Sequence, residues 1–292
     1  MSNNTEKTIK TLVIGVGDGG QDAVDNMRIL GLDGASFAVI NGNDQGFFFL
    51  VPRTLKPTLL RCDDLENDER IRNSLSGFDM VFVVATMSDR FGIDNVPLIG
   101  KIVKETGALT IGVVVHPFED RGAHSIEGIH HMKNSVDTLI TIPNQNVSTK
   151  SPSSEEIDRQ SSLALYKAVK AILYTQKSLR LMPVGLEDVC SLMKSSGLAV
   201  LGSGYAVGEG SVAAAIKKSI ISPLLDTSSL ASAKSVLITI TAPSSVQIFS
   251  IYGAVEIIIQ KVHRDAEVIF GLVIDDNIKG VDIAFVATRF AG

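Results

Sequence analysis

Short apolar runs alternate with amphipathic stretches along the first half of the chain. The runs are Thr11–Val16, Ser36–Asn41, Asp79–Ala85, Leu109–Val115 and Asp137–Ile142. Because they are almost continuously apolar, they are typical of parallel strands that are covered on both faces. Helical patterns lie between them, at Gln21–Leu30 and at Asn95–Thr106. Strands that alternate with helices predict an α/β fold with a parallel, Rossmann-like sheet and right-handed crossovers.

The second half of the chain has a different order of predicted helices and strands. Apolar residues in Ser161–Leu173 recur at helical spacing and predict a central helix. The elements predicted after it are the helices Leu186–Ser196, Ser211–Ile221 and Val246–Val262, and the strands Leu198–Val207, Ser235–Thr241, Glu267–Ile274 and Val281–Thr288. This mixture predicts a smaller α+β domain.

These patterns divide the chain into three parts. We expect a nucleotide-binding-type domain in residues 1–158, a central helix and its connection in 159–180, and a C-terminal α+β domain in 181–292. The polar, Ser-rich segment Asn146–Asp158 predicts a mobile loop before the central helix.

Composition narrows the class of protein. The chain has 292 residues, of which 45% are hydrophobic and 20% charged, and this balance indicates a globular protein. A net charge of −5, with no long basic run, argues against nucleic acid as a partner. The two cysteines, Cys62 and Cys190, fit a reducing compartment. With no signal-peptide pattern and no apolar run of about 20 residues, we expect a cytoplasmic protein without membrane insertion.

A glycine-rich turn, GVGDGG at 15–20, follows the first predicted strand and opens the first predicted helix. Glycines at such a place let the backbone approach a phosphate, and the helix N-terminus offers free N–H groups to it. The turn also satisfies the dinucleotide pattern G-x-G-x-x-G, but the ribose-binding acid expected at the end of the second strand is replaced by Asn41. A tight turn without any ligand is the third interpretation.

Several segments carry a resemblance to the FtsZ family of the tubulin superfamily. GVGDGGQDAVDNM at 15–27 is similar to the first phosphate loop of that family, and DMVFVVATM at 79–87 to the strand before its signature loop. GALTIGVVV at 107–115, VDTLITIPN at 136–144, SPLLD at 222–226 and VATRF at 286–290 are similar as well. The resemblance implies the tubulin/FtsZ fold, GTP binding, and head-to-tail polymers in which acids of one subunit complete the active site of the next.

The chain departs from this family at the signature loop, which reads GGGTGTG in the family and SDRFGID here, at 88–94. Only Gly92 is kept. Phe91 and Ile93 are expected to fill the space of the phosphate oxygens, and Asp89 and Asp94 add carboxylates, which Arg90 compensates only in part.

The first phosphate loop also departs from the family by gaining carboxylates. Asp18 replaces a glycine and Asp22 an asparagine, and a carboxylate at a helix N-terminus can take the place of a phosphate. A Mg²⁺ ion between carboxylates and phosphates would reverse this argument. The glycine-rich loop that the family has between its second and third strands has no counterpart in 52–67. The segment after Pro117-Phe118 is also shorter than in the family, and Glu119 and Arg121 are the possible substitutes for its ribose-contacting acid and arginine.

The residues with which the family recognises the base and supports hydrolysis are also replaced in this chain. By resemblance, Tyr166 takes the place of a base-stacking Phe, and Lys170 and Ala171 that of the Asn-Asp pair that reads guanine. The catalytic pattern N-x-D-x-x-D corresponds to PVGLED at 183–188, in which only Asp188 remains. Glu187 is a possible substitute, but both acids are also typical of a first helical turn.

The predicted remnant of a GTP site therefore has no complete catalytic set, with Asp188 as its one remnant acid. Its binding residues are Gly17, Asp18, Gly19, Gly20, Gln21, Asn41, Thr86, Met87, Gly92 and Tyr166. The histidines at 124, 130 and 131 lack metal-ligand spacing, so we expect no metal site. Phe47–Phe49 predicts core packing or, alternatively, a ring that plugs the cleft.

From these departures we expect an FtsZ-like cytoskeletal or cell-division protein with little or no GTP binding and hydrolysis, and no cofactor. Its expected partners are copies of itself or FtsZ-type filaments, so that it forms oligomers. The alternative is an active GTPase with a rearranged pocket that binds GTP or GDP with Mg²⁺. A nicotinamide-dependent enzyme is the third class, and it depends on the glycine turn alone.

Overall fold

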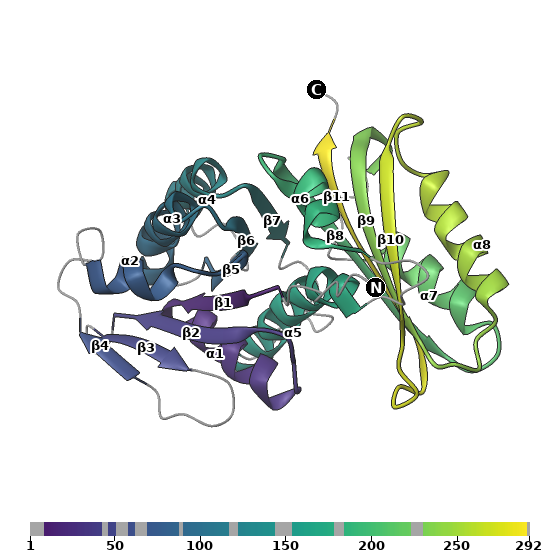
Figure 1. The fold of residues 1–292 in the computed structure, drawn as a ribbon, viewed down its shortest axis with the longest axis horizontal. Helices are drawn as coiled ribbons and strands as arrows, with labels where there is room; N and C mark the ends of the chain where they lie inside the picture. Colours follow the sequence, from purple (N-terminus) through teal and green to yellow (C-terminus); the bar gives the residue numbers. More distant parts are fainter. Residues whose placement is uncertain are drawn as a thin grey trace, which may run out of the picture.

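The computed structural model describes residues 9–42, 46–50, 58–61, 69–87, 90–116, 122–143, 154–177, 184–222 and 230–290. In this part of the chain, eleven strands form one continuous sheet in the order β10-β9-β11-β8-β7-β6-β5-β1-β2-β3-β4. The two halves of the chain occupy the two ends of this sheet, with helix α5 between them (Figure 1).

The first half contains the predicted parallel sheet. Its parallel strands, in spatial order, are β2 (Ser36–Asn41), β1 (Thr11–Val16), β5 (Met80–Thr86), β6 (Leu109–Val115) and β7 (Thr138–Ile142). Two further strands, β3 (Gly46–Leu50) and β4 (Thr58–Arg61), extend it in antiparallel fashion beyond β2. The sequence pattern did not predict these two strands, and the packing of the Phe47–Phe49 rings lies outside the described side chains.

Helices cover both faces of this sheet, which explains the nearly continuous apolar character of its strands. Val13 and Phe82 point to one face, where they pack with α1 (Gly17–Ile29) and α5 (Ser154–Leu173). Leu12 and Val83 point to the other face, which is covered by three helices. These are α2 (Glu69–Leu75), α3 (Arg90–Glu105) and α4 (Gly122–Ser135).

The second half forms the predicted α+β unit. Its strands are β8 (Gly197–Val207), β9 (Ala233–Ala242), β10 (Glu267–Ile274) and β11 (Gly280–Phe290). Its helices are α6 (Leu186–Met193), α7 (Ser211–Ile220) and α8 (Ile248–Ile259), with short 3₁₀ turns η1 (Tyr174–Lys177) and η2 (Leu230–Ser232). Helices α7 and α8 cover one face of these strands. The core around α5 continues onto the opposite face through Leu237 and Val286.

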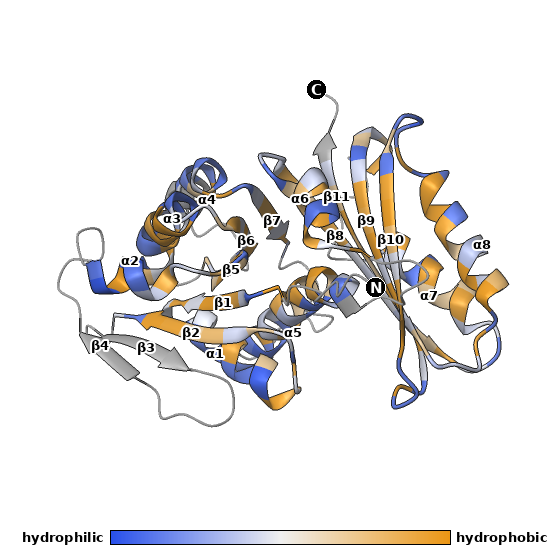
Figure 2. Cartoon of the chain, viewed as in Figure 1, coloured by the Kyte–Doolittle hydropathy of each residue, from blue (hydrophilic) through white to orange (hydrophobic). Residues whose placement is uncertain are grey.

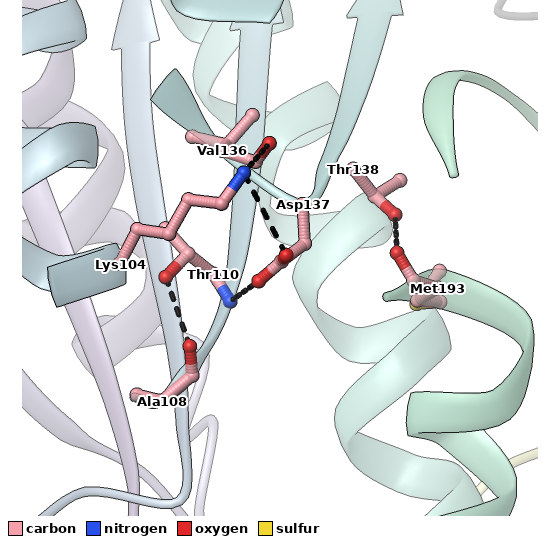
Figure 3. Close-up of polar contacts among 7 residues, drawn as sticks. All are labelled: Lys104, Ala108, Thr110, Val136, Asp137, Thr138 and Met193. Carbon is pink, nitrogen blue, oxygen red and sulfur yellow. Dashed lines mark hydrogen bonds and ion pairs between the residues drawn. The ribbon is translucent and has the colours of Figure 1, made fainter. Parts of the chain in front are cut away.

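Asp137 and Thr138 connect the two halves at the start of β7 (Figure 3). The buried Asp137 carboxylate accepts a 3.0 Å hydrogen bond from the Thr110 backbone N–H and lies 3.8 Å from Lys104 Nζ. The Asp137 carbonyl accepts from the N–H of Gly197, the first residue of β8. The Thr138 hydroxyl donates to the Met193 carbonyl at the end of α6. These contacts hold β7 beside β8 and make the sheet continuous.

The observed helix bounds correct part of the sequence prediction. The loop expected at Asn146–Asp158 is wrong for residues 154–158, which form the first turn of α5. Glu155 and Glu156 lie in that turn, where the helix dipole favours acids. Helix α3 starts at Arg90, so that Pro97 lies inside it. Helices α2 and α4 were not predicted. None of the described helices is long and apolar enough to cross a membrane.

Candidate functional site

The glycine turn joins β1 directly to α1 and folds closely against itself. Gly17, the first residue of α1, has a φ of +73°, in the left-handed region that favours glycine. A Cβ atom added to Gly15 would lie 2.2 Å from the Gly20 carbonyl oxygen, and one added to Gly20 would lie 2.8 Å from the Val84 oxygen. Backbone packing between β1, α1 and β5 therefore requires these glycines, whether or not a phosphate binds.

Thr86 occupies the space beside the turn. It is the last residue of β5, and its side chain is buried. A Cβ atom added to Gly19 would lie 1.9 Å from Thr86 Oγ1, so the threonine side chain rests on the α-carbon of Gly19. The surface of the turn that faces β5 is thus already in contact with a side chain of the protein.

Phe91 covers the end of the neighbouring strand. It lies in the first turn of α3, and a Cβ atom added to Gly42, just after β2, would lie 2.3 Å from its ring. Phe91 therefore packs over the carboxyl end of β2, beside the turn. Ile93 lies elsewhere: its methyl group packs against Gly128 of α4. Of the two side chains expected to fill the cleft, only Phe91 takes such a position.

Asn41 links the end of β2 to the first turn of α1. Its side-chain amide donates one hydrogen bond of 2.8 Å to the Asp18 carboxylate and one of 3.1 Å to Gln21 Oε1. The polar groups at this end of the sheet are thus bound to one another. The Asp18 carboxylate also adds a negative charge next to the N-terminus of α1, where the helix dipole stabilises it.

Carboxylates gather along this side of α1. Burial raises the pKa of Asp22, and the charges of Asp158, Asp25 and Asp18 raise it further. Asp158, at the start of α5, therefore lies close enough to Asp22 of α1 for its charge to act on it. Among the described residues, no group of three or more histidines, cysteines or acids is arranged to hold a metal ion.

Most of the predicted binding residues come together at the carboxyl ends of β1, β2 and β5. They are Gly17, Asp18, Gly19, Gly20, Gln21, Asn41 and Thr86. Met87 follows β5 and is fully buried, and Gly92 is buried within α3. Residues 88–89, 119, 121 and 183 lie outside the described part of the chain.

Tyr166 lies in a different place. It is eight residues beyond Asp158 on α5, which corresponds to about 12 Å along the helix axis. There it lines a cavity of about 880 Å³, together with Ser203 of β8, Thr239 of β9 and Asp282 of β11. The position expected for a base-stacking ring is thus turned toward the C-terminal strands. The sequence pattern gave no sign of this cavity, because its lining comes from elements far apart in the chain.

Lys170 is one of the charged residues that line the cavity. Its Nζ lies 2.8 Å from the Asp282 carboxylate and 5.9 and 5.3 Å from the ring centroids of Tyr166 and Tyr174. Burial lowers the pKa of Lys170, but Asp282, with smaller contributions from Tyr166 and Asp275, raises it, and the net shift is upward. The Tyr174 hydroxyl donates to Asp33, after α1, and burial raises the pKa of this phenol. Lys170 therefore joins α5 to β11.

Asp188, the remnant of the catalytic pattern, has a local role. Its carboxylate accepts a 2.7 Å hydrogen bond from the backbone N–H of Gly185 at the start of α6. This is the contact that an acid at the third helical position makes in a capping box. Glu187 lies exposed in the same helical turn.

A parallel α/β unit that carries a glycine turn, joined through a central helix to an α+β unit, defines the architecture of the tubulin/FtsZ class. Two family models match the chain. "Tubulin/FtsZ family, GTPase domain" matches residues 62–151, and "FtsZ family, C-terminal domain" matches residues 197–291. The chain is therefore an FtsZ-like member of the tubulin/FtsZ superfamily, as its motifs indicated.

Relatives of known name agree with this family. The cell division protein FtsZ of Bartonella bacilliformis is 33% identical over 94% of this chain and 50% of its own length. That of Rickettsia bellii is 32% identical over 94% and 65%. The chain thus spans about half to two thirds of the length of these relatives.

Solved structures establish the fold. An empty FtsZ dimer from M. jannaschii has a TM-score of 0.83 at 24% identity, with 97% of this chain and 89% of that chain covered. CetZ from Methanosaeta thermophila has a TM-score of 0.74 at 20% identity and covers 97% and 87%. The predicted fold class, a Rossmann-like sheet joined by a central helix to an α+β unit, is confirmed. The division into the three predicted parts stays a prediction.

Proposed function

We propose that this chain is an FtsZ-like protein of the cytoskeleton or cell division that acts through self-association or by binding FtsZ-type filaments, with little or no GTP binding and hydrolysis. The observation that carries the proposal is the contact between Thr86 and Gly19. Thr86 therefore takes up space beside Gly19 on the side of β5, and this narrows the room for a phosphate group at the turn. Phe91 limits the neighbouring space in the same way, since its ring rests on Gly42.

Electrostatics adds to this steric argument. Asp18 lies in the first turn of α1 and is held there by Asn41. Two like charges about 4 Å apart repel by ~1 kcal/mol in water and ~4 kcal/mol at an effective dielectric constant of 20. Micromolar binding is worth about 8 kcal/mol, so a few such contacts with a triphosphate would remove it.

The chain also lacks most of the polar residues that support GTP hydrolysis in the family. In the family pattern, three polar positions of one subunit face the nucleotide of the next. Two of them are Pro183 and Gly185 here, and the third, Asp188, is bound to the N–H of Gly185. A subunit of this chain would thus offer few groups to polarise a water molecule on its neighbour.

Without nucleotide chemistry, the proposed activity is protein interaction. FtsZ family members self-assemble into filaments, and the relatives that match this chain are FtsZ proteins. A chain that keeps the scaffold but lacks an active catalytic loop could join or cap such a filament. Its proposed partners are thus itself and FtsZ-type filaments.

The alternative is a working GTPase with a rearranged pocket. The acids Asp18 and Asp22 of the first loop favour it, because a Mg²⁺ ion between carboxylates and phosphates would turn their repulsion into attraction. In that case Thr86 and Phe91 would move on binding. The two proposals predict different results in any measurement of nucleotide binding or hydrolysis.

The deciding experiment is a calorimetric titration of the purified chain with GTP and Mg²⁺, combined with sedimentation of the same sample. A GTP-binding FtsZ, titrated in parallel, is the positive control. We expect no saturable heat and no shift of Tm, whereas a ligand at one hundred times its Kd would add ~2.7 kcal/mol to the free energy of unfolding. Saturable binding, with turnover that rises with protein concentration, would establish the alternative.

A further inference from the structure

The cavity between α5 and the C-terminal strands has a positively charged lining. Among the described residues that line it, four are lysines and one is an acid. The lysines are Lys167, Lys170, Lys218 and Lys279, and the acid is Asp282. The described lining therefore carries three more positive than negative charges, although the whole chain has a net charge of −5. The charge in this cavity is thus opposite in sign to that of the molecule.

The one acid of this described lining is already paired. The Asp282 carboxylate lies 2.8 Å from Lys170 Nζ, and both side chains are mostly buried. Lys218 Nζ donates a 2.9 Å hydrogen bond to the Tyr205 carbonyl, a neutral acceptor that leaves the charge of the lysine in place. Lys218 and Lys279 are exposed, and Figure 2 shows the turn between β10 and β11, which carries Lys279, in the hydrophilic colour. A cleft that is lined by charges of one sign attracts ions of the opposite sign.

Rings and hydroxyl groups complete the lining. Tyr166 and Tyr174 lie one helical turn before and one after Lys170, so the three side chains share one face of α5 and of the 3₁₀ turn that follows it. Tyr205 and Ser203 line the cavity from β8. The volume of about 880 Å³ lies within the range of sites for small organic molecules, which are lined by apolar and aromatic groups with a few polar ones. The cavity therefore suits an organic ligand better than a bare ion.

We propose that this cavity binds a small organic anion that carries an aromatic ring and a phosphate group. A phosphate monoester has nearly two negative charges at neutral pH, and among the described lining residues only Asp282 would repel it. The tyrosine rings and Ile221 offer apolar contacts to the aromatic part. The proposal is independent of nucleotide binding at the glycine turn, because no residue of that turn is among the described residues that line the cavity.

The inner wall of the cavity is ordered before any ligand binds. Lys170 is held by Asp282, and the Tyr174 hydroxyl donates a 3.3 Å hydrogen bond to Asp33, after α1. Side chains that are fixed in advance lose less freedom on binding, which lowers the entropic cost. Because the lining comes from α5 and from strands of the C-terminal unit, a ligand in contact with both would stabilise the folded chain.

The first test measures the chemical selectivity of the cavity with three probes. The full chain is titrated into 1-naphthyl phosphate, whose fluorescence anisotropy is followed, since the chain has no tryptophan to interfere. We expect saturable one-to-one binding that weakens as salt rises. 1-Naphthol, which lacks the phosphate, and inorganic phosphate, which lacks the ring, should each compete at least about tenfold more weakly. The absence of saturable binding, or equal competition by either fragment, would overturn the proposal.

The second test locates the bound probe by substitution. Lys167→Met removes a charge from the lining, and Ser203→Phe fills the cavity without changing any charge. Each should weaken the binding of 1-naphthyl phosphate about tenfold or more, with an unchanged CD spectrum. Lys217→Met is the matched control, because Lys217 of α7 is exposed and is not among the described lining residues, and it should leave the Kd unchanged. Lys167→Met and this control decide the question even if Ser203→Phe does not fold. An equal loss in the control, an unaffected Lys167→Met variant, or tighter binding by Asp18→Asn at the glycine turn would contradict the proposal.

Discussion

The side-chain amide of Asn41 donates a 2.8 Å hydrogen bond to the Asp18 carboxylate, between the end of β2 and the first turn of α1. The pair places a negative charge of the protein itself at the helix N-terminus that follows the glycine turn. Free N–H groups and the helix dipole stabilise an anion there. The chain therefore supplies part of the charge that a nucleotide phosphate would otherwise bring.

Replacing this carboxylate should destabilise the protein. We expect Asp18→Ala to lower the free energy of unfolding by roughly 0.5–1 kcal/mol, because the helix loses its favourable first-turn charge. Urea unfolding at low and high salt measures the effect, which should shrink as salt screens the dipole. Asp18→Asn, which keeps the shape but not the charge, is the matched variant. An Asp18→Ala protein of unchanged stability that binds GTP tightly would contradict the proposed role of Asp18.

Removing the charge of Asp22 should stabilise the protein, whereas removing that of Asp18 should destabilise it. Its pKa is raised by burial and by the carboxylates of Asp158, Asp25 and Asp18, so its charged form is less favourable in the folded state than in the unfolded state. The cost is absent below the ordinary pKa of 3.8, grows as pH rises from there to the raised value, and is complete above it. Asp22→Asn should therefore raise Tm at pH 7, and the gain should vanish as pH falls toward 4.

The control for Asp22 is Glu209→Gln, an exposed acid before α7. It should leave Tm nearly unchanged over the same pH range. A gain for Asp22→Asn that is as large at acid pH as at neutral pH would show that its cause is not electrostatic.

The packing of the turn can be tested by a paired substitution. Gly19→Ala should destabilise the protein by more than about 2 kcal/mol, because its methyl group would overlap the Thr86 side chain. Thr86→Gly removes the obstacle, so the double variant should lose less than the sum of the two single variants, with a coupling of about 1–3 kcal/mol. Denaturant unfolding of all four proteins measures this coupling.

Gly15→Ala is the control for that cycle. The atoms nearest to its added methyl group belong to the backbone of Gly20, so Thr86→Gly should not rescue it. Additive losses in the Gly19 and Thr86 cycle would mean that the two residues do not touch.

The local pattern of apolar residues was enough to predict most of the fold. The bounds of β1, β2, β6 and β10 agree with the predicted runs. For β1, β2 and β6 the reason is that buried parallel strands need continuous apolar sequence. Helix α4 was missed because GAHSIEGIHHMKNS, with its two glycines and three histidines, has a weak apolar period. Strands β3 and β4 were missed for another reason. They extend the sheet by pairing with each other and with β2, which a single segment does not reveal.

The candidate site was predictable only in part. The residues from Gly17 to Gln21 are adjacent in the chain, and Asn41 and Thr86 end neighbouring strands, so their meeting follows from the topology. Tyr166 shows the limit of this reasoning. Its place was assigned by matching the central helix to the family pattern. Because each residue of a helix points in its own direction around the axis, a match that is shifted by a few residues puts the side chain on another face of the helix. The ion pair between Lys170 and Asp282 spans 112 positions of sequence and has no local signal.

That ion pair should contribute to the attachment of α5 to β11. The side chains of Lys170 and Asp282 are 19 and 26% exposed, so removing one partner leaves a mostly buried charge. We expect Lys170→Met to cost roughly 1–3 kcal/mol in the free energy of unfolding, less than a fully buried pair because water still reaches both groups. The double variant with Asp282→Leu should recover much of this loss. Lys167→Met, on the same helix and the same cavity, should cost less than Lys170→Met.

The pH dependence of this effect follows from the sign of the shift. Because Asp282 raises the pKa of Lys170 above 10.5, the pair contributes fully at neutral pH and is lost only as pH rises through the raised value. The difference in stability between the unsubstituted chain and Lys170→Met should thus be constant from pH 6 to 9. If the double-mutant cycle gave no coupling in that range, α5 would be held to β11 by apolar packing alone.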